Sequence, residues 1–145
     1  MSEKETPVRV AAGIIHKNGK VLLCQRKPGA PLELLWEFPG GKAFEYEAIE
    51  QALSRELNEE LGIAIREVRP VYTTRATYGS ASFDVTFFIV DKYAGAVTNY
   101  EFHNLAWVPP KDLERYKILD GNKEIIEQIS NGTIPLSPPE LEDEL

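Results

Sequence analysis

The chain has 145 residues, of which 43% are hydrophobic and 27% are charged, and its formal net charge at pH 7 is −7. This length can bury one substantial core and is too short for two comfortable domains, so we expect a single domain. The negative balance argues against a nonspecific nucleic-acid surface and against an anionic membrane partner, because both attract basic surfaces.

Cysteine content and apolar runs indicate where the protein resides. Cys24 is the only cysteine, which excludes an intramolecular disulfide, and the N-terminal stretch MSEKETP lacks the apolar region of a secretion signal. No apolar run approaches the length that spans a membrane. We therefore expect a cytoplasmic protein.

The first third of the chain predicts a hairpin followed by a loop. Residues 8–15 and 21–25 are apolar and β-rich, and they flank the turn signal Lys-Asn-Gly-Lys at 17–20. A loop rich in proline and glycine then leads into Trp36, Glu37 and Phe38. After these residues we expect a glycine turn.

A helix is predicted next. Apolar residues recur at helical spacing from Ile49, Glu47 lies just ahead where a negative charge suits a helix N-terminus, and Gly62 supplies a C-terminal stop. The sequence therefore predicts a unit of strand, glycine loop and helix.

The second half predicts a hairpin, a short strand and a helix. Residues 68–77 and 82–91 are β-branched or aromatic and flank Tyr-Gly-Ser, residues 105–108 form a strand that Pro109 stops, and residues 119–129 have helical spacing. Interleaved helices and strands favour an α/β (α+β) layered domain. We assign residues 1–133 to this domain and residues 134–145 to a flexible acidic tail.

Three glutamates on the predicted helix indicate a metal site. Glu56, Glu59 and Glu60 stand at i, i+3 and i+4, so their carboxylates share one side, where they continue the apolar stripe. Inward-leaning carboxylates lose hydration unless a cation or hydrogen bonds compensate them. Hard cations such as Mg²⁺, or Mn²⁺ in its place, take such oxygen ligands. The alternative is an ordinary solvated acidic face.

This segment resembles the Nudix box, G-x5-E-x7-R-E-U-x-E-E-x-G-U, where U is aliphatic. Every specified position is met, by Gly41, Glu47, Arg55, Glu56, Leu57, Glu59, Glu60, Gly62 and Ile63. The resemblance implies a mixed β-sheet sandwiched between helices. It also implies hydrolysis of a nucleoside diphosphate linked to another moiety, with metal ions held by the box glutamates.

Three further features resemble the MutT group within this superfamily. They are the stretch WEFPGGK from Trp36 to Lys42, Arg26 at the distance before the box that the group shows, and Asn122 in Asp-Gly-Asn ahead of the last helix. This resemblance implies conversion of 8-oxo-dGTP to a nucleoside monophosphate and pyrophosphate, which sanitises the nucleotide pool. It leaves open CTP or dCTP as substrate, another nucleoside diphosphate derivative, and a noncatalytic nucleotide-binding domain.

The resemblance also implies roles for particular residues. The expected metal ligands are the Gly40 carbonyl, Glu56, Glu59, Glu60 and Glu101. The expected catalytic residues are Glu59 or Glu60 as general base, with Arg55, Glu101 and Lys42. The expected substrate contacts are Arg26, Phe38 and Asn122. The partner is a small-molecule nucleotide, and the protein is a monomer or a homodimer.

Each residue outside the box also has a plain structural interpretation. Asn122 suits a helix N-cap, Phe38 a core position and Glu101 an ordinary loop. Arg26 suits a strand-end charge and Lys42 an exposed surface. Residues 73–83 and Gly121 depart from the group's pattern, which leaves substrate choice open.

Overall fold

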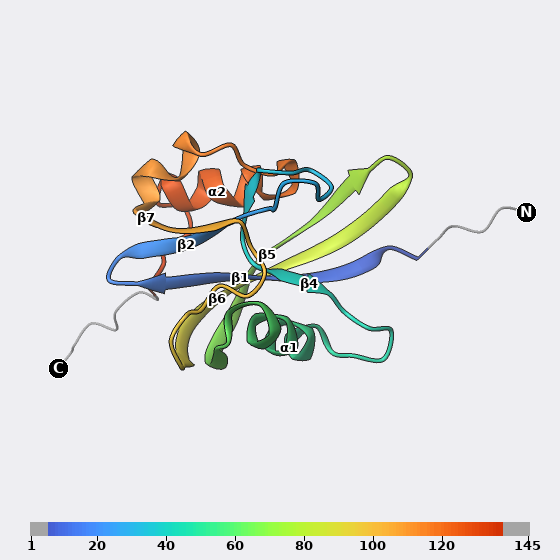
Figure 1. Ribbon diagram of the computed structural model, residues 1–145, viewed down its shortest axis with the longest axis horizontal. Helices are drawn as coiled ribbons and strands as arrows, with labels where there is room; N and C mark the ends of the chain where they lie inside the picture. Colours follow the sequence, from blue (N-terminus) through green and yellow to red (C-terminus); the bar gives the residue numbers. More distant parts are fainter. Residues whose placement is uncertain (1–5, 138–145) are drawn as a thin grey trace, which may run out of the picture.

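Helices cover both faces of a mixed β-sheet in the computed structural model, which describes residues 6–137 (Figure 1). The elements in chain order are β1 (Val8–Lys17), β2 (Lys20–Gln25), β3 (Trp36–Glu37), β4 (Gly40–Lys42), α1 (Ile49–Leu61), β5 (Ala64–Tyr78), β6 (Ala81–Ala94), β7 (Asn104–Val108) and α2 (Lys123–Ser130). Short 3-10 helices span Pro110–Arg115 and Asp120–Asn122. The α+β class, both hairpins and both helices are confirmed.

Strand β1 is the centre of the sheet. It pairs in parallel with β6, antiparallel with β4, and with β2 only at its last two residues. Ala11 and Ile15 join the buried cluster under α1, whereas Ala12 and Ile14 join the cluster on the other face with α2. Because successive side chains of a strand point to opposite faces, one apolar strand serves both halves of the core.

Helix α1 lies close against β1. Leu53 and Leu57 are fully buried, and a Cβ added at Gly13 would lie 3.0 Å from Cδ1 of Leu57. The helix ends where the sequence predicts, because Gly62 adopts the left-handed conformation with φ of 71° and its N–H donates to the Asn58 carbonyl. The sheet therefore fixes the height and direction of the helix that carries the glutamates.

Two local assignments were wrong. The glycine turn expected after Phe38 is strand β4, whose three residues pair with residues 10–12 of β1. The helix expected from residue 119 begins at Lys123, after a 3-10 turn at Asp120–Asn122. In both places a contact distant in sequence overrides the local pattern.

The expected tail begins by packing on the domain. Ile134 and Leu136 lie against the cluster under α2, and Nη2 of Arg69 donates a hydrogen bond of 2.6 Å to the Leu136 carbonyl. Ile134 and Leu136 thus contact the domain, and the assignment of residues 134–145 to a flexible tail stays a prediction. Residues 138–145 of that assignment lie outside the described residues.

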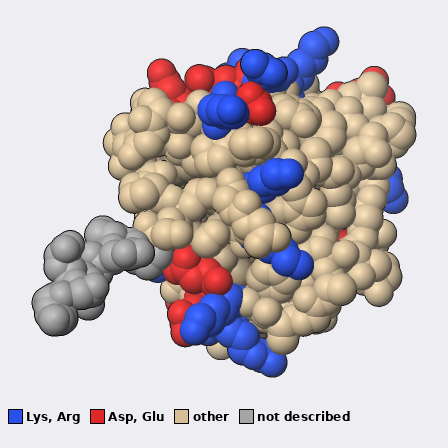
Figure 2. All heavy atoms as spheres, turned by 90° about the vertical axis from the view of Figure 1, so that its left-hand side faces the viewer, with Lys and Arg blue, Asp and Glu red and all other residues tan. Residues whose placement is uncertain are grey.

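Charge is interspersed on the face that Figure 2 presents. Basic and acidic side chains gather together near its upper and lower edges, and a largely uncharged surface lies between them. Within residues 6–137, no helix has both the length and the apolar character needed to cross a membrane.

Candidate active site

Helix α1 and strand β4 bring two carboxylates together. Glu56 and Glu60 lie one turn apart on α1, and the Glu56 carboxylate is close enough to Glu60 to disfavour its charged form. The backbone N–H of Gly40 donates to Oε1 of Glu60 at 3.2 Å. Burial, and then the neighbouring Glu56 carboxylate, raise the pKa of Glu60 well above its usual value. Among the described residues, Glu60 has no cationic partner, whereas Glu56 is paired with Arg55.

The two glycines of β4 make this close approach geometrically feasible. A Cβ at Gly41 would overlap the Glu56 carboxylate, and a Cβ at Gly40 would overlap the Ala11 carbonyl oxygen of β1. Any larger residue at either position would separate the strand from the carboxylates or from the sheet. The glycines are thus needed for packing against the acids.

Arg55 is held on the other side of Glu56 by a bidentate pair with Glu47. Its Nε and Nη2 each donate to the Glu47 carboxylate at 2.9 Å, and Nη1 lies 3.3 Å from Oε2 of Glu56. Nη2 also donates to the Lys42 carbonyl at 2.9 Å. The Arg55 hydrogen bonds lower the pKa of Glu47 to about 2 and raise the pKa of Arg55. Arg55 therefore orients Glu56 and is itself oriented by Glu47.

Glu59 stands apart from the other two acids. Its side chain is 59% exposed, against 17% for Glu56, and its Oε1 lies 3.7 Å from Nη1 of Arg55. Within residues 6–137, no three acidic, histidine or cysteine side chains converge closely enough to hold one metal ion. The structure thus brings together two of the three helix acids, with the third on the adjacent surface.

The donor set nevertheless suits a divalent cation. Glu56 and Glu60 present facing carboxylates beside strand β4, and all of their ligand atoms are the hard oxygens that Mg²⁺ and Mn²⁺ prefer. Two facing carboxylates need either a shared proton or a cation between them.

A cavity of about 470 Å³ opens beside this pair. Its lining joins residues distant in sequence, and the expected site residues among them are Arg26, Phe38, Gly40, Gly41, Lys42, Glu60, Glu101 and Asn122. Glu101 and Lys42 are exposed at its edge, and Nζ of Lys42 lies 6.0 Å from the centre of the Phe83 ring. The predicted substrate contacts and Glu60, one of the paired acids, therefore line the same cavity.

Asn122 is buried in this cavity, with 7% of its surface exposed. Its Oδ1 accepts the backbone N–H of Phe38 at 2.8 Å, across 84 residues of sequence. Asn122 occupies the N-cap position of α2, as expected, but its side chain makes no capping hydrogen bond to the helix. Because Phe38 N–H is a donor, the amide oxygen must face it, and the Nδ2 group faces elsewhere.

Arg26 has partners within the protein. Its Nη1 donates to Glu37 at 2.9 Å and its Nε donates to the Pro31 carbonyl at 2.7 Å. Burial raises the pKa of Glu37 despite the arginine beside it. The pair lines the cavity near the paired glutamates, so Arg26 presents the remaining edge of its guanidinium group there.

The residues of the cavity wall that sequence reasoning missed include Glu37, Tyr78 and Phe83. Glu37 lies within the WEFPGGK stretch, and its charge next to an apolar core sequence was the available signal. Tyr78 and Phe83 come from the β5–β6 hairpin, where no local pattern distinguishes a cavity residue from any other aromatic strand residue.

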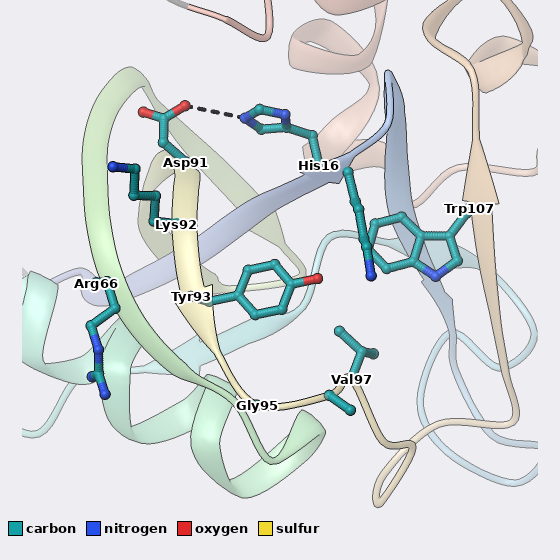
Figure 3. Close-up of a pocket in the computed structure, with 10 residues that line it drawn as sticks. His16, Arg66, Asp91, Lys92, Tyr93, Gly95, Val97 and Trp107 are labelled. Carbon is teal, nitrogen blue, oxygen red and sulfur yellow. Dashed lines mark hydrogen bonds and ion pairs between the residues drawn. The ribbon is translucent and has the colours of Figure 1, made fainter.

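A larger cavity, about 760 Å³, lies elsewhere, between the ends of β1 and β6 and strand β7 (Figure 3). There Asp91 is paired with His16 at 3.1 Å and with Arg69 at 2.7 Å, and the exposed Lys92 is paired with Glu67. Asp91 and Lys92 of its lining are thus engaged in ion pairs within the protein. It contains none of the box glutamates, so we place the chemistry in the smaller cavity.

Comparison with known proteins shows the family of the chain. Residues 6–129 match the family model described as NUDIX domain. The chain is 32% identical to the CTP pyrophosphohydrolase of Escherichia coli over 83% of this chain and 89% of that protein. It is also 32% identical to the 8-oxo-dGTP diphosphatase of Haemophilus influenzae, over 87% and 93%. The crystal structure of the MutT NUDIX hydrolase from Burkholderia pseudomallei superposes with a TM-score of 0.78 at 26% identity, over 86% and 98%.

Proposed function

The chain belongs to the NUDIX family and is a Nudix pyrophosphohydrolase of nucleotide substrates, and from this premise we propose that its preferred substrate is 8-oxo-dGTP. The products are the nucleoside monophosphate and pyrophosphate. One observation carries the choice of base, namely the buried amide of Asn122 in the cavity next to Glu60.

Asn122 presents a hydrogen-bond donor to the base. Its Oδ1 is engaged by Phe38 N–H, and among the hydrogen bonds of the described residues its Nδ2 has no protein acceptor. A donor group suits a base edge with a carbonyl acceptor, as guanine and 8-oxoguanine have. Cytosine places an amino donor on its corresponding edge, which would leave two donors facing each other. This favours guanine or 8-oxoguanine over cytosine, and we choose the oxidised form because one relative is named 8-oxo-dGTP diphosphatase.

NUDIX hydrolases use divalent metal ions, and we assign the ligands here to Glu56, Glu60, the Gly40 carbonyl, Glu59 and Glu101, with Mg²⁺ as the ion and Mn²⁺ as its substitute. When bound, the ions spread the charge of the triphosphate and acidify an attacking water. Arg55 keeps the Glu56 carboxylate oriented toward β4, and Lys42 adds a positive charge at the cavity edge.

Water attacks phosphorus at the β position, where a new P–O bond forms as the bond to the oxygen bridging the α-phosphate breaks. Glu59 or Glu60 accepts the proton of the water. The nucleoside monophosphate leaves with the bridging oxygen and pyrophosphate keeps the oxygen from water. Phe38 forms an apolar wall of the cavity, and Arg26 lies beside it.

The test is a nucleotide panel with the variant Asn122→Asp. Aspartate retains an oxygen for Phe38 N–H but replaces the Nδ2 donor by an acceptor. We expect kcat/KM for 8-oxo-dGTP to fall by about 100-fold, with a smaller loss for CTP, because a site built to donate loses its partner. Asn131→Asp, at the exposed end of α2, is the matched control.

Two outcomes redirect the proposal. A wild-type preference for CTP or dCTP would overturn the choice of base and favour the activity named for the Escherichia coli relative. Absence of pyrophosphate release from any triphosphate with Mg²⁺, in wild-type and Glu60→Gln alike, would indicate a noncatalytic nucleotide-binding domain instead.

A further inference from the structure

A tyrosine on the β5–β6 hairpin is tied to the turn that carries Asn122. The hydroxyl oxygen of Tyr78 accepts the backbone N–H of Gly121 at 2.8 Å. Gly121 immediately precedes Asn122, and all three residues line the cavity of about 470 Å³. The hairpin and the Asp120–Asn122 turn thus form one continuous wall.

The contact depends on the absence of a side chain at residue 121. A Cβ there would lie 2.9 Å from the Tyr78 hydroxyl oxygen and 3.4 Å from Cβ of Ala76. The backbone of Gly121 is outside the left-handed region, so alanine fits its conformation and only the tyrosine would have to move. The sequence departure at Gly121 therefore has a structural cause, the close approach of Tyr78.

The tyrosine ring is also fixed. Its centroid lies 6.0 Å from that of Phe83 on the opposite strand, with an angle of 63° between the ring planes. Asn122 is held in turn by Phe38 N–H on its side chain and by its own N–H, which donates to the Leu119 carbonyl. Tyr78 supplies the restraint from the hairpin side.

We propose that Tyr78 is a positioning residue for base selection, which acts through Gly121 to hold the Asn122 amide in place. This inference rests on the proposed contact between Asn122 and the base. Removing the Tyr78 hydroxyl leaves the cavity volume nearly unchanged. It also removes the hydrogen bond that restrains the Asp120–Asn122 turn, so the Nδ2 group of Asn122 can adopt more orientations. Binding of the base is then weakened, while the phosphate chemistry at α1 continues.

The experiment compares Tyr78→Phe with wild-type on 8-oxo-dGTP, dGTP and CTP. We expect KM for 8-oxo-dGTP to rise about threefold to tenfold with kcat nearly unchanged, and its advantage over CTP to fall by a similar factor. Gly121→Ala should give the same change. The double variant should be no worse than the more affected single variant, because both remove one contact.

Tyr93→Phe is the matched control, since Tyr93 lines the remote cavity of Figure 3. It should leave all three nucleotides unaffected. A uniform fall in kcat for every nucleotide in Tyr78→Phe, or effects that add in the double variant, would overturn the positioning role. If Tyr78→Phe keeps the wild-type selectivity while Asn122→Asp is impaired, the positioning role of Tyr78 is refuted and the base contact of Asn122 stands. If Asn122→Asp is not impaired, the proposed base contact itself is refuted.

Discussion

Single residues near the site fall into two electrostatic classes. Glu47 is stabilised as an anion by two guanidinium hydrogen bonds, whereas Glu60 is destabilised as an anion by burial and by Glu56. Both carboxylates lie within the same motif, and only the first has its counter-charge within the protein. The Glu47–Arg55 ion pair therefore needs no ligand, whereas the Glu60 carboxylate is left for a cation.

The Glu47 pair predicts an acid-dependent loss of stability. Its pKa falls from 4.5 to about 2 on folding, so the folded state binds fewer protons than the unfolded state between these values. The contribution is fully present above about pH 4.5 and is lost as the pH falls toward about 2. Glu47→Gln should be less stable than wild-type in metal-free buffer near neutrality, and the difference should shrink through this window.

Urea unfolding at a series of pH values measures this effect. Glu45→Gln serves as the control, because Glu45 is exposed in the same loop. A difference between wild-type and Glu47→Gln that stays constant across the acid range would show that the pair does not couple to folding.

At the scale of elements, residues 134–136, which follow α2, contact both the core cluster and strand β5. Ile134 and Leu136 join the cluster under α2, and the Leu136 carbonyl accepts the Arg69 side chain from β5. This segment therefore links the region after α2 to β5, which is an edge strand of the sheet.

Truncation of the chain at two points tests how much these contacts of residues 134–136 stabilise the fold. A chain ending at residue 133 should lose about 2 kcal/mol of unfolding free energy relative to one ending at residue 137, because two partly buried aliphatic side chains and a hydrogen bond are removed. Thermal or chemical unfolding measures the difference. Equal stability of the two truncated chains would show that these contacts add nothing.

At the scale of the whole molecule, the proposed metal site joins distant segments. Glu56 and Glu60 come from α1, the Gly40 carbonyl from β4, and Glu101 from the loop before β7. A ligand that binds only when these segments are assembled stabilises the fold as a whole.

Metal addition should therefore raise the melting temperature. At a concentration about 100 times its dissociation constant, Mg²⁺ should add about 2.7 kcal/mol, and a chelator should reverse the gain. Glu60→Gln should lose most of this response while the metal-free protein stays at least as stable, since burial and Glu56 already disfavour the charged form of Glu60 and glutamine is neutral. Glu50→Gln, exposed on α1, should respond like wild-type. An undiminished response in Glu60→Gln would contradict this ligand assignment.

The sequence by itself determined the elements whose cause is local. Helical spacing from Ile49, the stop at Gly62 and the turn residues of both hairpins placed α1 and most strands. The spacing of the acids predicts a site on α1. Helical spacing could not separate Glu59 from Glu60, because the burial of each depends on β4 and Arg55.

The tertiary structure alone decided the contacts that join remote segments. Pairing with β1 makes a strand of the glycines at 40 and 41, Phe38 fixes the Asn122 amide across 84 residues, and Tyr78 reaches Gly121 across 43. The physical reason is that each side chain has a local partner available, such as the N-terminus of α2 for Asn122. Only the packed sheet and helices bring the competing distant partner within hydrogen-bonding distance.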